Sequence, residues 1–120
     1  FIASDLSAGA MAIEIDGGFA GVVGISRARE LGYWLAIPHH GRGLMTEAAS
    51  ALVARHFAGS DETLTSGYLT GNAGSARVLA KLGFRDTQVL LRRSNPLDRD
   101  VEVQRMELTP TQWQARPRGE

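Results

Sequence analysis

The 120-residue sequence contains no cysteine, which excludes a disulfide framework, a thiolate nucleophile and a cysteine zinc site. It has no apolar run long enough to cross a bilayer and no basic-then-apolar leader, so we expect a cytoplasmic protein without a membrane partner. It has no excess of either charge, because 13 basic residues balance 13 acidic ones, so no global field would attract nucleic acid. The length predicts a single domain over residues 1–120.

Histidine is also scarce, with three residues in the chain. His39 and His40 are adjacent on a segment that we expect to be extended, where neighbouring side chains point to opposite sides. No carboxylate lies at the spacing of a metal ligand beside them. We therefore expect no metal site.

The hydrophobic pattern predicts six strands and a mixed α/β fold. Apolar and polar residues alternate from Met11 to Ile15, and a second β-rich run follows from Phe19 to Ile25. The turn Asp16-Gly17-Gly18 between them predicts a hairpin, because such residues adopt the positive φ of tight turns. The run over residues 31–37 is almost wholly apolar, which predicts a strand covered on both faces. The predicted strands span residues 11–15, 19–25, 31–37, 63–69, 87–92 and 101–108.

Two helices are predicted between these strands. From Thr46 to Phe57 the apolar positions fall at helical spacing, with Thr46 or a residue just before it as the cap. A second helix starts at Asn72 or Ser75 and ends at Gly83. The first helix is a crossover, so the strands that flank it form one parallel pair in a mostly antiparallel sheet, with the helices packed on it.

The two ends of the chain carry weaker patterns. The first ten residues show no clear period. The tail from Pro110 is polar apart from Trp113, and we expect it to fray beyond that residue.

A glycine-rich turn joins the strand over 31–37 to the first helix. Its sequence is Pro38-His39-His40-Gly41-Arg42-Gly43-Leu44-Met45-Thr46-Glu47-Ala48. The first turn of a helix has unsatisfied N–H groups and a partial positive charge, and glycines keep side chains away from that end. The segment therefore predicts a cradle for the phosphate groups of a cofactor.

Two other phosphate-binding motifs are excluded. A Rossmann dinucleotide site needs a third glycine in step and an acidic residue at the end of a following parallel strand. A P-loop needs Gly-Lys followed by Ser or Thr. Neither pattern occurs in this chain.

Two blocks of the sequence resemble the GNAT superfamily of N-acetyltransferases, in the branch of the ribosomal-protein N-terminal (alanine) acetyltransferases. The first block consists of LGYWL at residues 31–35 and HGRGLMTEA at 40–48, and the second is NAGSARVLAKLGF at 72–84. The resemblance covers nearly the whole chain from residue 11 onward. It implies a GNAT-like fold, acetyl-CoA as the co-substrate and direct acetyl transfer to an amine.

The resemblance also implies the contacts of acetyl-CoA. The turn would hold the pyrophosphate, although His40 and Met45 depart from the family pattern (Gln/Arg)-x-x-Gly-x-(Gly/Ala). The strand before the turn would diverge from the next parallel strand and offer backbone groups to the pantetheine arm. Asn72 would bind the pantetheine amides and Ser75 would protonate the leaving thiolate, although both also suit plain helix capping. The implied cofactor-binding residues are Leu35, Ala36, Ile37, His40, Gly41, Arg42, Gly43, Leu44, Met45, Thr46, Asn72 and Ser75, with Arg77 and Lys81 as further cations.

Acetyl transfer to an amine needs a base, a polarised carbonyl and a proton donor for the thiolate. A backbone N–H near Leu35 or Ala36 would polarise the carbonyl. Glu30 lies at the entry of the same strand and is our first candidate for the catalytic base, directly or through water, beside the plain interpretation of a strand-end carboxylate. Weaker candidates for the base are Tyr33, Tyr68 and His39.

The acceptor stays open between a protein N-terminus and a small molecule such as a polyamine, an amino acid or an antibiotic. The alternative outside the enzymes is a non-catalytic acyl-CoA-binding module. In the resembled family a first strand and two helices form one wall of the acceptor groove, whereas about ten residues precede Met11. We therefore expect a chain that lacks this N-terminal part or completes its groove with a second copy, as a homodimer, because exposed apolar sheet favours association.

Overall fold

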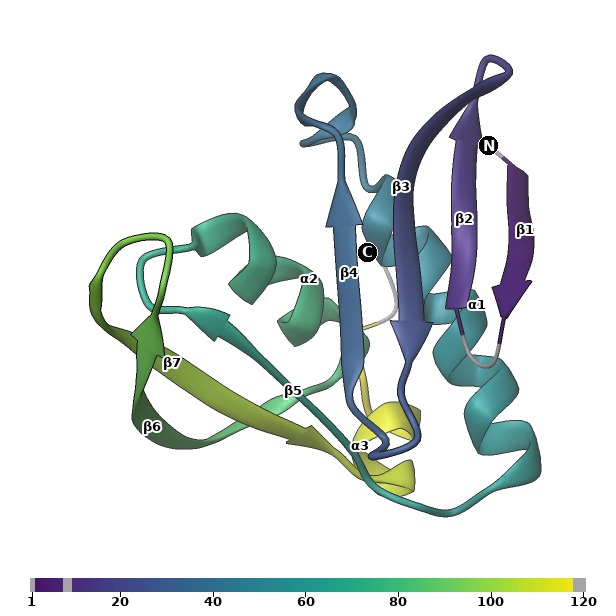
Figure 1. Ribbon diagram of the computed structural model, residues 1–120. Helices are drawn as coiled ribbons and strands as arrows, with labels where there is room; N and C mark the ends of the chain where they lie inside the picture. The colour runs from purple at the N-terminus through teal and green to yellow at the C-terminus, as the bar shows by residue number, and fades with distance from the viewer. Residues whose placement is uncertain (1, 8–9, 118–120) are drawn as a thin grey trace.

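Two antiparallel sheets form the β-structure of the computed structural model, which describes residues 2–7 and 10–117 (Figure 1). The first sheet has the order β1-β2-β3-β4. Its strands are β1 (Ile2–Ser7), β2 (Ala10–Ile15), β3 (Gly18–Ile25) and β4 (Leu31–Leu35). The second sheet has the order β5-β7-β6, and its strands are β5 (Leu64–Leu69), β6 (Arg85–Ser94) and β7 (Arg99–Leu108).

The α-helices of the described residues are α1 (Leu44–Gly59), α2 (Ala73–Leu82) and α3 (Pro110–Gln114). The first two pack against each other, and α1 also packs against β3. None of the helices in this part of the chain is long and apolar enough to cross a membrane. Helices and both sheets share one hydrophobic core, whose fully buried side chains include Ile13, Val53, Leu64, Leu79, Leu82 and Leu108.

The two sheets meet at a single parallel bridge between Glu30, just before β4, and Thr65 in β5. Beside it, the Thr65 N–H donates to the Arg29 carbonyl at 2.9 Å and the buried Ser66 hydroxyl donates to the Leu31 carbonyl at 2.9 Å. Beyond this point β4 and β5 diverge, and α2 lies in the opening between them (Figure 1). The predicted parallel crossover pair is therefore reduced to its first bridge.

The end of β4 differs from the prediction of a strand over residues 31–37. The strand ends at Leu35, and the segment Ile37–His39 forms a 3₁₀ turn, η1, with Pro38 in its first turn. Proline cannot donate to a ladder, which explains why the pairing stops here. Ile37 is 80% exposed, so the apolar run leaves the core before it ends.

The prediction that this strand is covered on both faces is wrong. Leu31 and Leu35 are buried, whereas Gly32 is exposed and Trp34 is 54% exposed. Trp34 instead stacks on Phe19 of β3, with 6.2 Å between the ring centroids. An apolar run alone does not reveal which of its faces the rest of the molecule covers.

Two elements were not predicted. β1 has no sequence period, and it exists because its backbone pairs antiparallel with β2. The tail forms α3, and its Trp113 is buried in the core. A local signal for α3 was available, because Thr109 and Gln112 form a capping box with reciprocal hydrogen bonds.

Candidate active site

Gly43 is the N-terminal cap of α1 and adopts the left-handed conformation, with φ 73°. The helix therefore starts at Leu44, and its cap lies three residues before Thr46, whereas the sequence predicts Thr46 or a residue just before it. No side chain caps this end, and the first intrahelical bond runs from the Glu47 N–H to the Gly43 carbonyl at 3.0 Å. The N–H groups of residues 44–46 precede that bond and have no acceptor inside the helix.

A cavity of about 420 Å³ opens in front of this helix end, between β4 and α2. Its lining includes the cations Arg77 and Lys81 of α2, and no acidic residue is among the described residues that line it. The helix end adds its own partial positive charge. The loop and helix residues that line the cavity are His39, His40, Gly41, Gly43, Leu44, Met45 and Thr46. We call this space the donor cavity; its chemistry suits an anionic, phosphate-bearing ligand.

One edge of β4 faces the donor cavity. The Ala36 N–H donates to the Ala20 carbonyl of β3 at 2.7 Å. Backbone groups alternate along an extended chain, so the N–H groups of Tyr33 and Leu35 point to the opposite edge. Tyr33 and Leu35 both line the cavity.

The backbone carbonyls at the end of β4 already have partners. The His40 ring donates through Nε2 to the Leu35 carbonyl at 2.6 Å, which fixes the proton on that nitrogen because a carbonyl only accepts. The carbonyls of Ala36 and Ile37 accept from the N–H groups of His39 and His40, at 2.9 and 3.0 Å. The sequence predicts that an N–H group near Leu35 or Ala36 polarises the thioester carbonyl. The Ala36 N–H is bound to the Ala20 carbonyl of β3, whereas the Leu35 N–H faces the cavity.

The side chains of the loop differ in where they lie. The Arg42 guanidinium donates to Nδ1 of His39 at 3.4 Å on the surface. Met45 is 5% exposed and belongs to the hydrophobic core. His40 Nε2 is already bound to the Leu35 carbonyl. The backbone N–H groups are therefore the hydrogen-bond donors that this loop presents most directly to a phosphate.

Asn72 and Ser75 lie at the start of α2, as predicted. Asn72 is the N-terminal cap, and its Oδ1 accepts from the Ser75 N–H at 3.1 Å. The capping interpretation of Asn72 is confirmed. Both residues also line the donor cavity.

A second cavity of about 540 Å³ lies against β3 and β4, and we call it the acceptor cavity. Glycine and other small residues, including Ala10, Gly24 and Gly32, make up much of its wall. Glu30 supplies a carboxylate, and Ser26, Tyr33 and Ser75 supply hydroxyl groups; Gly67 lines the side nearest β5.

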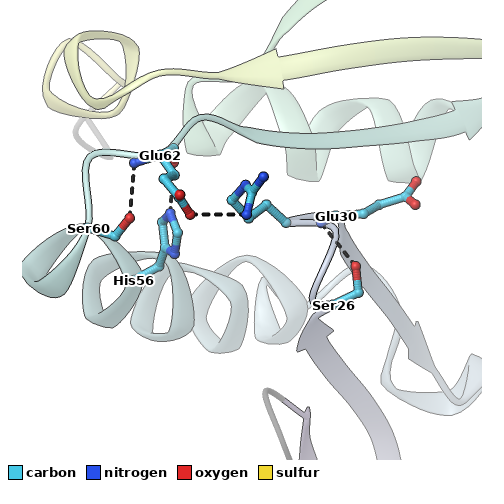
Figure 2. Close-up of polar contacts among 6 residues, drawn as sticks. Ser26, Glu30, His56, Ser60 and Glu62 are labelled. Carbon is cyan, nitrogen blue, oxygen red and sulfur yellow. Dashed lines mark hydrogen bonds and ion pairs between the residues drawn. The ribbon is translucent and has the colours of Figure 1, made fainter.

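Glu30 is fixed by contacts on several sides. Its N–H donates to the Ser26 hydroxyl at 3.2 Å, and its Oε2 accepts from Nη1 of Arg105 at 2.8 Å. Gly67 allows that ion pair, because a Cβ on it would lie 3.0 Å from the same Nη1. The Glu30 side chain points away from the neighbouring group of His56, Ser60 and Glu62 (Figure 2).

Tyr33 and Ser75 line both cavities. The Tyr33 hydroxyl lies 2.8 Å from the Ser75 hydroxyl oxygen and 3.3 Å from the Ser75 carbonyl. Burial raises the pKa of Tyr33 above 10.0, and the hydrogen bond with Ser75 partly offsets this. Sequence reasoning ranked Tyr33 low because nothing in the local pattern connects two residues 42 positions apart.

The other residues considered as bases lie elsewhere. His39 lines the donor cavity beside the phosphate loop. Tyr68 is part of β5 and packs against the hydrophobic core. Among the residues that the structure describes, no group of three His, Cys, Asp or Glu side chains is placed to hold a metal ion.

Three solved structures illustrate the likeness of this fold to known proteins. The ribosomal-protein-alanine N-acetyltransferase from Brucella melitensis superposes with a TM-score of 0.74 at 19% identity, covering 83% of this chain and 67% of its own. The ribosomal-protein-S5-alanine acetyltransferase from Vibrio fischeri gives 0.74 at 21%, covering 87% and 62%. The microcin C7 self immunity acetyltransferase MccE, solved in complex with acetyl-CoA and AMP, gives 0.72 at 21%, covering 83% and 59%.

The TM-scores of these three structures establish the fold. The likeness shows the fold alone, because each structure is less than 25% identical to this chain. The chain spans between 59% and 67% of their lengths. No curated protein matches it in sequence. The family model for the acetyltransferase (GNAT) domain matches residues 3–85, which is more than half of the 120 residues. The chain therefore belongs to the GNAT family of acetyltransferase domains.

Proposed function

We propose that this chain is an acetyl-CoA-dependent N-acetyltransferase that transfers the acetyl group directly to an amine. The observation that carries the proposal is the meeting of the two cavities at Tyr33 and Ser75. One cavity has the chemistry of a phosphate site and the other contains a carboxylate. A donor and an acceptor held on either side of one hydroxyl pair suit direct transfer between them.

Acetyl-CoA fits the donor cavity by charge and by hydrogen bonding. The open N–H groups at the start of α1 would bind its pyrophosphate, with Arg77 and Lys81 as cations nearby. The edge of β4 that faces the donor cavity would lie along the pantetheine arm. Asn72 keeps amide N–H groups for the same arm after its Oδ1 has capped α2.

The chemistry divides among three groups of this chain. Bound acetyl-CoA supplies an acetyl group activated as a thioester. Glu30 takes a proton from the acceptor ammonium, directly or through water, so that the nitrogen can attack. The Leu35 N–H donates to the carbonyl oxygen while negative charge develops on it. Ser75 gives its hydroxyl proton to the sulfur as the carbon–sulfur bond breaks.

The acceptor belongs to one of two chemical classes, a protein N-terminus or a small amine. The structural likeness to ribosomal-protein-alanine acetyltransferases favours the N-terminus of a protein. A polyamine, an amino acid or an amine-bearing antibiotic is the second candidate. Both classes bring a cation to the acceptor cavity, where Glu30 is the carboxylate.

Mass spectrometry of separate acceptor pools tests the proposal. The protein is incubated with acetyl-CoA and with peptides of defined N-termini, polyamines, amino acids or aminoglycosides. We expect one pool to gain acetyl groups in proportion to protein and time, and heat-denatured protein to give none. Calorimetry then separates the alternatives, because binding of acetyl-CoA without acetylation of any pool would indicate a non-catalytic acyl-CoA-binding module.

A further inference from the structure

The contact between Tyr33 and Ser75 joins β4 to α2 at the point where the two cavities meet. Their hydroxyl oxygens lie 2.8 Å apart, which is the ordinary length of an O–H···O hydrogen bond. Both residues line both cavities, so the pair has a donor side and an acceptor side.

Either hydroxyl could donate in this contact, and the arrangement in which Tyr33 donates leaves the Ser75 proton available for transfer. The Tyr33 phenol is protonated at neutral pH, because its ordinary pKa of about 10 is raised further by burial, so it has a proton to donate. Ser75 is held at the start of α2, where its N–H is bound by Asn72 Oδ1. When the Ser75 oxygen accepts from Tyr33, its own O–H is free to turn into the donor cavity.

We propose that Tyr33 is a second catalytic residue beside Ser75, which orients the Ser75 hydroxyl toward the donor and returns a proton to it. This inference rests on the proposed function. As the carbon–sulfur bond breaks, Ser75 gives its proton to the sulfur and takes the proton of Tyr33. Tyr33 regains a proton from the acceptor nitrogen after that nitrogen has bonded to the acetyl carbon.

The protons balance over the reaction. An ammonium acceptor loses two protons on becoming an amide. The first goes to Glu30 and then to water, before the nitrogen attacks. The second passes from nitrogen through Tyr33 and Ser75 to the sulfur, so the products are the amide, the free thiol and one released proton.

Tyr33→Phe tests the inference, because it keeps the ring and removes the hydroxyl. The assay follows release of the coenzyme A thiol with a thiol reagent, and the protein adds no background because it has no cysteine. With the acceptor pool that is acetylated, we expect kcat to fall about 10- to 100-fold while KM for acetyl-CoA stays within about twofold. We expect kcat of Ser75→Ala to fall at least as far. The kcat of the double variant should fall no further than that of Ser75→Ala alone.

Tyr68→Phe is the matched control, since it removes the hydroxyl of the chain's second tyrosine, which is in β5. We expect it to keep the rate of the parent protein. The relay also predicts that the solvent deuterium isotope effect on kcat shrinks in Tyr33→Phe, which a purely structural role would not cause. Full kcat in Tyr33→Phe, or losses that add in the double variant, would overturn the inference while leaving the proposed function intact.

A parent protein that binds acetyl-CoA and acetylates none of the pools would overturn both proposals. The two failures are therefore distinguishable, because failure of the Tyr33 inference alone is seen only when the parent protein is active. Calorimetry with acetyl-CoA on each variant shows whether a loss of rate arises from loss of binding.

Discussion

Glu30 reaches the acceptor cavity because residues far from it in sequence hold it there. Arg105 lies 75 positions away and binds its carboxylate at 2.8 Å. At the level of single residues, the sequence predicted roles for Glu30 from its strand end and for Ser75 from a motif. It could not identify Arg105, Gly67 or the partner of Ser75, because those contacts depend on strands and helices meeting in space.

The first prediction concerns the Glu30 carboxylate. Glu30→Gln keeps the shape of the side chain and removes the proton acceptor, so we expect kcat to fall about 100-fold or more. The affinity for acetyl-CoA should stay unchanged, because Glu30 lines the other cavity. Glu62→Gln is the matched control: it breaks a surface pair with Arg29 at 3.2 Å and should leave kcat unchanged. A Glu30→Gln variant with the parent rate would remove Glu30 from the mechanism.

The second prediction concerns the pH dependence of stability through Tyr33. Its pKa is raised in the folded chain by burial, so the folded state holds the phenol proton more tightly than the unfolded state. The stabilisation is complete below the unfolded pKa of about 10 and is lost as pH rises through the higher folded pKa. Urea unfolding across alkaline pH should show a steeper loss of stability for the parent protein than for Tyr33→Phe. Equal slopes would contradict the burial of this phenol.

At the level of elements, the helix α1 starts after a glycine cap at the place where the sequence predicts a phosphate cradle. The periodicity located α1 and α2 well, and it located most strands to within a few residues. It placed the cap of α1 at Thr46 or just before it, because the glycines before Thr46 hide the first turn, which begins at Leu44. It extended β4 to Ile37 because apolar character continues after the hydrogen bonding has stopped.

The third prediction tests the cradle by charge at Gly43. Asparagine and aspartate both tolerate the left-handed conformation, and a Cβ at this position meets no atom within 4 Å. Gly43→Asp places a carboxylate where the pyrophosphate would bind, so we expect Kd for acetyl-CoA to rise about tenfold or more. Gly43→Asn is nearly isosteric and uncharged, and its Kd should change much less. Calorimetry measures Kd for acetyl-CoA in both variants. Equal Kd values would show that the phosphates do not bind at this helix end.

At the level of the whole molecule, the divergence of the two sheets creates the site. A single parallel bridge fixes β4 to β5, and α2 lies in the opening, which brings Ser75 to Tyr33 (Figure 1). The same arrangement leaves Phe19 and Trp34 stacked on the surface, at 64% and 54% exposure. Exposed aromatic pairs of this kind favour association.

The fourth prediction is that two copies of the chain associate in solution. Static light scattering should give twice the mass of one chain at micromolar concentration. Phe19→Ser should shift the population toward the monomer, because it removes one ring of the exposed pair. Leu97→Ser is the control, since Leu97 is 52% exposed in the turn between β6 and β7 and should leave the mass unchanged. A parent protein that stays monomeric would contradict the prediction.

The sequence by itself determined the features that depend on neighbours along the chain: the α/β class, two helices, the glycine cradle and the motifs of the GNAT family. Hydrophobic periodicity and glycine placement are local properties, so they can be followed in one dimension. Only the tertiary structure decided which face of β4 is covered, which N–H faces the donor cavity, and that Arg105 and Tyr33 join Glu30 and Ser75. These contacts span 42 to 75 positions, and they form only when buried side chains bring the two sheets and α2 together.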